Sequence, residues 1–294
     1  MLDQAERLRR MVEGDSIVPD LDTNNEVKKE DKAKIITVTS GKGGVGKSNF
    51  VVNLGITLQK QGKKVLIFDA DIGMGNDDVL MGVFPKYSMF DVIKGREIEE
   101  IVEEGPYGIK LLSGGSGINQ IEDLKQEERK IFLDKLENLN GFDYILMDTG
   151  AGINRSALAF IACSDEVIVI TTPEPTSLTD AYSLIKTADH FKVKDKVKIV
   201  VNRALDEEEG MQTYNRLYSV VTKFLNMDAS FLGYILDDRK LVKGVREQVP
   251  FSIKYPNSDA ARCIELISNK ILENNKNQGI GAKGLFKKLF KLFA

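Results

Sequence analysis

The most constraining feature of this sequence is a glycine-rich loop that directly follows an apolar run. Residues 40–48 read Ser-Gly-Lys-Gly-Gly-Val-Gly-Lys-Ser, after the strand-like stretch 35–39. Glycines let backbone N–H groups curl around phosphate oxygens, and the start of the helix expected over 49–61 adds a partial positive charge. The loop therefore predicts a site for the phosphates of a nucleoside triphosphate.

Each polar residue of this loop has an expected task. Lys47 is expected to reach the β and γ phosphates, and the Ser48 hydroxyl to hold Mg²⁺. A glycine-rich turn without a ligand is the alternative, which the preceding strand and the following amphipathic stretch disfavour. The predicted nucleotide-binding residues of the loop are Gly41, Gly43, Gly44, Val45, Gly46, Lys47, Ser48 and Asn49.

Carboxylates follow two other apolar runs. Asp69 ends the run 64–69, and Asp71 follows two residues later. Alternation along an extended chain places both on one side, where either could handle Mg²⁺ or water. A cap on the following turn is the alternative for Asp69. Asp148 closes the run 144–148 and is expected to reach the metal through a water. The predicted metal ligands are Ser48, Asp69 and Asp148.

The 294 residues alternate strand-like runs with helical patterns and contain no long central linker. This predicts an α/β fold with a doubly wound, mostly parallel sheet and helices on both faces. The expected strands are 35–39, 64–69, 109–113, 144–148, 166–171, 197–202 and 231–236. We expect an N-terminal helix over 1–12, an acidic linker over 13–32, a nucleotide-binding domain over 33–274, a linker over 275–282 and a C-terminal helix over 283–294.

Cysteine and charge exclude several classes of protein. Cys163 and Cys263 lie 100 positions apart without a C-x-x-C pair, which argues against a disulfide framework and a zinc site and fits a reducing cytosol. No apolar run reaches 18 residues, and no signal sequence is evident. Setting aside the five lysines of residues 275–294 turns the net charge of −3 into −8, so no specific nucleic acid is expected as a partner.

The last twelve residues predict a helix that lies in a membrane surface. Their apolar positions fall within roughly 160° of a helical wheel, and four lysines without an acid fill the remainder. A core helix is also amphipathic and is the alternative. The predicted contacts with an anionic membrane are Leu285, Phe286, Leu289, Phe290, Phe293, Lys287, Lys288 and Lys291.

Lys42, near the start of the loop, makes it similar to the deviant phosphate-binding loop of the MinD/ParA class of P-loop ATPases. This resemblance implies that ATP lies between two subunits, that Lys42 crosses into the partner's site, and that Asp71 positions the attacking water. Lys42, Asp71 and Lys47 are thus the expected catalytic residues. It also implies adenine contacts from Asn202, Arg203 and the loop around Asp237. Leu236 and Gly150 stand where MinD usually has proline.

Residues 3–9, with the pattern D-Q-A-x-x-L-R, resemble the activator motif of the FlhG family, also called YlxH or FleN. The resemblance implies that Gln4 and Arg9 stimulate the GTPase FlhF, and that the flagellar switch proteins FliM and FliN/FliY are further partners. A short frayed helix is the alternative.

The combined resemblance implies an ATP- and Mg²⁺-dependent ATPase that controls flagellar number or placement. It would form a homodimer with ATP and lie in the cytoplasm, reversibly at the inner face of the cell membrane. A ParA-like DNA-partitioning ATPase and a MinD-like division-site ATPase are the alternatives. An iron–sulfur carrier of the same superfamily would need a C-x-x-C pair, which the sequence lacks.

Overall fold

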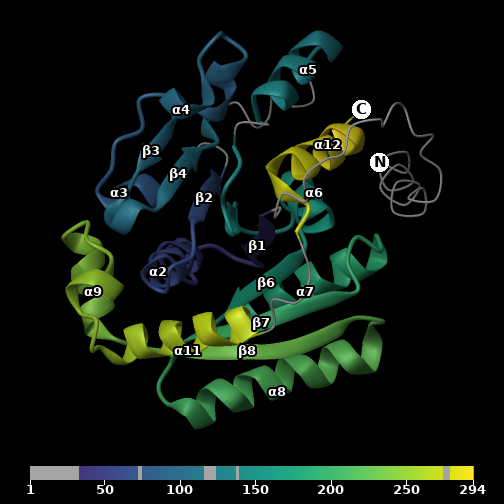
Figure 1. Ribbon diagram of the computed structural model, residues 1–294. Helices are drawn as coiled ribbons and strands as arrows, with labels where there is room; N and C mark the ends of the chain where they lie inside the picture. The colour runs from purple at the N-terminus through teal and green to yellow at the C-terminus, as the bar shows by residue number, and fades with distance from the viewer. Residues whose placement is uncertain (1–32, 72–74, 116–123, 137–138, 274–278, 294) are drawn as a thin grey trace.

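The computed structural model describes residues 33–71, 75–115, 124–136, 139–273 and 279–293. In these ranges eight strands form one sheet, in the order β3-β4-β2-β5-β1-β6-β7-β8 (Figure 1). Only β3 is antiparallel, to its neighbour β4. The strands are β1 (Lys34–Ser40), β2 (Val65–Ala70), β3 (Val102–Glu104), β4 (Lys110–Ser113), β5 (Tyr144–Thr149), β6 (Glu166–Thr171), β7 (Lys196–Ala204) and β8 (Asp228–Leu236).

Helices cover both faces of the sheet, which gives three layers. One face packs on α2 (Lys47–Lys60), α3 (Asp77–Met81), α9 (Arg239–Arg246), α10 (Phe251–Lys254) and α11 (Asp259–Glu273). The other packs on η1 (Met89–Val92), α4 (Ile98–Ile101), α5 (Gln126–Lys135), α6 (Arg155–Cys163), α7 (Pro175–His190), α8 (Glu207–Phe224) and α12 (Gly281–Phe293). The short turn η2 (Pro106–Gly108) joins β3 to β4.

The sequence prediction of the fold is confirmed. All seven expected strands are present, because runs of apolar residues that are buried on both faces are typical of a parallel sheet. The additional strand, β3, was not predicted. It has three residues, two of them glutamates, and pairs only at the edge of the sheet, so it has no apolar run that could signal it.

The C-terminal helix α12 packs against the protein body. It begins at Gly281, two residues before the predicted start, and its apolar residues join the core formed with α5, α6 and β2. The Phe286 ring lies 5.8 Å from the Phe68 ring and 5.0 Å from the Phe132 ring, measured between centroids. The side chains buried on this face are Ala282, Leu285, Phe286, Leu289 and Phe290.

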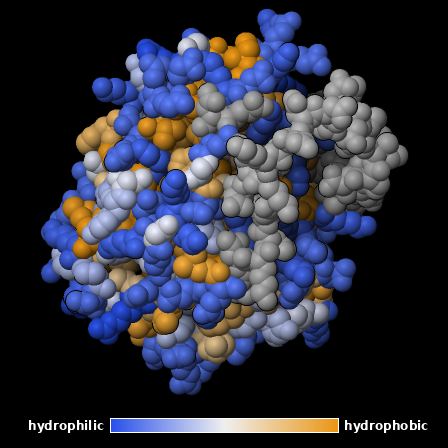
Figure 2. Space-filling model, viewed as in Figure 1, coloured by the Kyte–Doolittle hydropathy of each residue, from blue (hydrophilic) through white to orange (hydrophobic). Residues whose placement is uncertain are grey.

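This packing buries the apolar face of the helix, so the face is available to a membrane only if α12 leaves the body, and membrane binding stays a prediction. In this state the alternative of a core helix describes it, and the lysines Lys287, Lys288 and Lys291 face solvent. The start of the helix is also held, because the Gly281 N–H donates to the Ala33 carbonyl at 3.1 Å. On the face shown in Figure 2, hydrophobic residues form small separate groups among hydrophilic ones.

Some expectations fall outside the described residues. The structure does not describe the expected N-terminal helix with Gln4 and Arg9, the linker over 13–32, or the first half of the linker over 275–282. The side chain of Phe293 is also not described. None of the described helices is both long enough and apolar enough to cross a bilayer.

Candidate nucleotide site

The sheet brings Lys47, Asp69 and Asp148, all predicted from the sequence, together at the carboxyl ends of β1, β2 and β5. The β2–β5 register places Asp69 beside Asp148, and the β1–β5 register places Val38 on the other side of Asp148. The glycine-rich loop leaves β1 two residues after Val38 and leads into α2, whose first residue is Lys47. The carboxyl ends of parallel strands are where ligands bind in doubly wound folds.

Lys47 and Asp148 form a buried ion pair in this site. The Lys47 Nζ donates to Asp148 Oδ1 at 2.5 Å, and the side chains are 7% and 2% exposed. A charge-assisted hydrogen bond between buried partners is strong. A nucleotide phosphate would therefore have to compete with Asp148 for this lysine.

The same site holds more carboxylates than cations. Burial, with the nearby Asp148 carboxylate, raises the pKa of Asp69 to about 7. The wholly buried Asp77, at the start of α3, has its pKa raised by burial and then by Asp148 and Asp69. No described group donates a hydrogen bond to the Asp77 carboxylate, which lies against the carboxylate of Asp148. Such a cluster of carboxylates favours the binding of a cation.

The residues present fit Mg²⁺ that is bound together with phosphate. Mg²⁺ prefers oxygen ligands and is held by one or two carboxylates plus substrate phosphates rather than by a complete protein cage. The raised pKa values of Asp69 and Asp77, each caused in part by Asp148, indicate that carboxylates outnumber positive charges at this site. Within the described ranges no three His, Cys, Asp or Glu side chains are arranged to hold a metal by themselves.

Asp77 is a site residue that sequence reasoning missed. It lies at the first position of α3, eight residues after Asp69, in a short helix that presents no strong pattern. The available signal was the density of acids between 69 and 78, where four of ten residues are aspartates. Acids at the start of a helix usually interact with the helix dipole in solvent, so burial of this one could not be inferred.

Asp71 lies between the end of β2 and the segment that follows β5. Its N–H donates to Asp69 Oδ1 at 3.1 Å, and a Cβ placed on Gly150 would lie 3.2 Å from Asp71 Oδ1. Burial raises the pKa of Asp71, an effect that the nearby Lys47 opposes. This position fits the expected role in orienting water, which stays a prediction.

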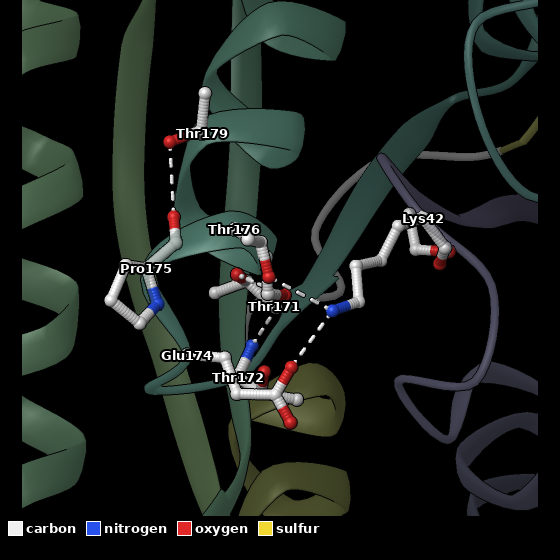
Figure 3. A network of polar contacts seen from close by, with 9 residues as sticks. Lys42, Thr171, Thr172, Glu174, Pro175, Thr176 and Thr179 are labelled. Atoms are coloured by element: carbon white, nitrogen blue, oxygen red, sulfur yellow. Dashed lines mark hydrogen bonds and ion pairs between the residues drawn. The ribbon is translucent and has the colours of Figure 1, made fainter.

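The Lys42 side chain points to the start of α7 in the same subunit (Figure 3). Its Nζ donates to Glu174 Oε2 at 2.8 Å and to Thr176 Oγ1 at 3.1 Å. The preceding Gly41 packs so closely on α7 that a Cβ there would lie 2.1 Å from the carbonyl carbon of Asp180. Only glycine fits at position 41.

Asn202 forms a hydrogen bond that stabilises the glycine-rich loop. Its Nδ2 donates to the Val45 carbonyl at 2.7 Å, and its Oδ1 accepts from the Arg203 N–H at 2.9 Å. A Cβ on Gly46 would lie 2.2 Å from this Nδ2, and Gly46 has a φ of 91°, so glycine is required there as well. The predicted adenine contacts of Asn202, Arg203 and Asp237 stay predictions.

Comparisons with known proteins identify the family. A model of the AAA domain family matches residues 33–201. The antiactivator FleN of Pseudomonas aeruginosa is 34% identical over 243 residues, covering 81% of this chain and 86% of FleN. The flagellum site-determining protein YlxH of Helicobacter pylori is 36% identical over 266 residues, covering 88% of this chain and 90% of YlxH. The chain belongs to the FleN/YlxH (FlhG) family of MinD/ParA-type P-loop ATPases.

Solved structures of MinD proteins share the fold of this chain. The MinD cell division protein of Aquifex aeolicus has a TM-score of 0.66 and 26% identity, over 83% of this chain and 99% of that one. The septum site-determining protein MinD of Pyrococcus horikoshii, solved with Mg-ADP, has a TM-score of 0.64 and 24% identity, over 84% and 99%, and shows the shared fold. The predicted family is confirmed, and the roles of single residues stay predictions.

Proposed function

We propose that this FlhG-family protein is a regulatory ATPase that dimerises around ATP and Mg²⁺, binds the inner face of the cell membrane reversibly through α12, and controls flagellar number or placement. The names of the two similar proteins, an antiactivator and a flagellum site-determining protein, support the flagellar role. The phosphate-binding loop and its carboxylates support the ATPase.

The main support for this proposal is a contact between α12 and β2, the strand that carries Asp69. Phe286 of α12 packs on Phe68, the residue directly before Asp69. Phe68 also packs on Phe160 of α6, and α6 follows the segment that faces Asp71. A shift of β2 or of this segment on nucleotide binding would therefore reach the pocket that holds α12.

Docking and membrane binding exclude each other, because both need the same apolar side chains. Leu285, Phe286, Leu289 and Phe290 are buried in the body and cannot enter a bilayer from there. The exposed lysines are each worth roughly 1 kcal/mol near an anionic surface, so one released helix holds weakly. Two helices on one dimer gain avidity through effective concentration.

The chemistry follows from the positions of the charged groups. Phosphoryl transfer to water requires in-line positioning and neutralisation of charge more than covalent help. On nucleotide binding, Lys47 would leave its ion pair with Asp148 and bind the phosphates. Asp71 would orient the water. Lys42 would neutralise charge in the site of the other subunit. Bound Mg²⁺ would supply further neutralisation, held by Ser48, Asp148 and Asp69.

The partner proposals rest on residues outside the described ranges. By family resemblance, Gln4 and Arg9 would enter the active site of FlhF and stimulate its GTPase, and FliM and FliN/FliY would bind elsewhere. Deleting residues 1–12 should abolish stimulation of FlhF and leave the protein's own ATPase intact. Full stimulation by the truncated protein would remove the activator arm from the proposal.

Sedimentation with vesicles that contain anionic lipid tests the central step. The full chain should bind with a non-hydrolysable ATP analogue and much less with ADP. Replacing Phe290 by aspartate should abolish binding, whereas replacing the exposed Lys223 on α8 by glutamate serves as the charge control and should leave it unchanged. Equal binding with both nucleotides would contradict nucleotide control.

One surface favours the DNA-partitioning alternative and was not foreseen from net charge. Helix α9 exposes Arg239, Lys240, Lys243 and Arg246, a local basic group on an acidic body. Non-specific DNA binding depends on such charges and weakens as salt rises. Saturable binding to duplex DNA with ATP analogue, lost on Lys243→Glu and without binding to lipid, would favour this alternative.

A further inference from the structure

We propose that Glu174 and Thr176 form a latch that holds Lys42 within its own subunit and raises the ATP concentration needed for dimerisation. This inference rests on the proposed function, because it requires that Lys42 act across the dimer. It adds a control at the start of α7 that opposes the crossing.

The latch consists of two acceptors at one helix end. Glu174 is the residue before α7, and Thr176 is the second residue of the helix. The Lys42 Nζ lies 2.8 Å from Glu174 Oε2 and 3.1 Å from Thr176 Oγ1, so one ammonium group is shared between them (Figure 3). The Lys42 hydrogen bond, with its charge, lowers the pKa of Glu174, as expected for an ionised carboxylate that faces an ammonium group.

The loop delivers Lys42 to this position. Gly41 lies against the α7 backbone at Asp180, where a Cβ would not fit. The Ser40 hydroxyl donates to the Lys42 carbonyl at 3.0 Å, and the Gly152 N–H donates to the Ser40 carbonyl at 2.9 Å. The main chain around Lys42 is therefore fixed to α7 and to the segment after β5, and only the side chain is free to swing.

The acceptors are fixed as well. Pro175 begins α7, and the Ser177 hydroxyl bonds the Thr172 N–H and the Thr171 hydroxyl, each at 3.0 Å. Thr179 Oγ1 donates to the Pro175 carbonyl at 3.0 Å. This network, drawn in Figure 3, holds the turn that carries Glu174 and Thr176. Because the acceptors are already ordered, closing the latch costs little further conformational entropy.

The two lysines of the loop are held with different strength. Lys47 and Asp148 are almost completely buried, whereas the side chains of Lys42 and Glu174 are 32% and 55% exposed. Exposed ion pairs are weak and are screened by salt. The latch therefore tunes dimerisation rather than preventing it, and its removal should shift the ATP requirement by about two- to fivefold.

Occupation of the latch and entry into a partner's site compete for one ammonium group. If Glu174 instead guided Lys42 across the interface, its removal would weaken the dimer. The two roles predict shifts of opposite sign, so a single substitution distinguishes them. Glu174→Gln keeps the size of the side chain and removes the charge, and Thr176→Val removes the second acceptor with little change in shape.

The experiment is a titration of full-length protein with a non-hydrolysable ATP analogue and Mg²⁺, with dimer measured by sedimentation velocity. Glu174→Gln should lower the half-maximal analogue concentration by about two- to fivefold, and Thr176→Val should lower it less. Glu104→Gln is the matched control, because it breaks the Lys110–Glu104 pair, which is similarly exposed and 2.6 Å long. It should cause no shift.

An unchanged or raised half-maximal concentration in Glu174→Gln would overturn the latch. Failure of the latch differs visibly from failure of the proposed function. If the wild-type protein forms no dimer with the analogue, the proposed function fails. If it forms one that Lys42→Ala abolishes while Glu174→Gln causes no shift, only the latch fails.

Discussion

Lys47 and Asp148 form an ion pair that links the phosphate-binding loop to the end of β5 through a 2.5 Å contact between Nζ and Oδ1. The two residues have unequal surroundings. Asp71 and Asp77 also feel the charge of Lys47, so this lysine serves several carboxylates. Removal of the lysine and removal of Asp148 should therefore have different consequences.

Lys47→Met should destabilise the nucleotide-free protein by about 3–5 kcal/mol, the usual cost of leaving a buried charge without its partner. Asp148→Asn should cost clearly less, because the remaining carboxylates can still pair with Lys47 and because acid crowding falls. Urea unfolding of both variants measures the difference. Equal losses would show that Lys47 interacts with Asp148 alone.

Ionisation of Asp69 should make the stability of the nucleotide-free and magnesium-free protein depend on pH. Its pKa is about 7 in the folded protein, against 3.8 for an ordinary aspartate. Between these values the folded state holds a proton that the unfolded chain has lost, so this contribution to stability falls as pH rises. The free energy of unfolding of Asp69→Asn, relative to that of wild type, should increase as the pH rises from 5 to 7. It should stay constant above about pH 7.5.

Thermal melts of wild type and Asp69→Asn across that range measure the effect. Asp91→Asn is the opposite control, since hydrogen bonds from Ser88 lower the pKa of Asp91. Its stability relative to wild type should stay constant from pH 5 to pH 8 and improve only as the pH falls below about 4. A constant difference between wild type and Asp69→Asn from pH 5 to pH 8 would contradict the raised pKa.

The thiol of Cys163 should report whether α12 is docked. Cys163 belongs to the core that α12 covers, and burial raises its pKa to about 12. Phe286→Ala should loosen α12 and accelerate alkylation of Cys163 at least about tenfold, because access and thiolate fraction both increase. Lys291→Ala, on the exposed face, should leave the rate unchanged.

Mass spectrometry of the alkylated peptides gives both rates in one sample, with the buried Cys263 as an internal reference. Fast alkylation of Cys163 in the wild-type protein without nucleotide would show that α12 does not stay docked.

Asp71→Ala should slow ATP turnover by about 100-fold or more while leaving nucleotide binding intact, because only water positioning is lost. The variant should accumulate as a dimer on anionic vesicles with ATP itself. Asp78→Ala, a nearby acid on α3, is the control and should retain normal turnover. Normal turnover in Asp71→Ala would transfer the catalytic role to Asp69.

The sheet and much of the site could be predicted because their signals are local. A phosphate-binding loop between a strand and a helix is specific, and acids at the ends of buried strands meet at one edge of a parallel sheet. The structure brings Lys47, Asp69 and Asp148 together at this edge, and their roles in binding and catalysis stay predictions.

Other features depend on contacts between distant segments and could not be predicted. The pattern of Leu285, Phe286, Leu289 and Phe290 suits a bilayer and a protein groove equally well, so the sequence could not tell that the body holds α12. Glu174 lies 132 positions from Lys42, and nothing in its local sequence indicates that it accepts this lysine. The burial of Asp77 likewise results from packing around the site.

Sedimentation velocity of the full-length protein with Mg²⁺ and a saturating non-hydrolysable ATP analogue tests the central claim most directly. The account predicts a species of twice the monomer mass for the wild-type protein and a monomer for Lys42→Ala, with both proteins still binding the analogue. A wild-type protein that binds the analogue and sediments only as a monomer would contradict it.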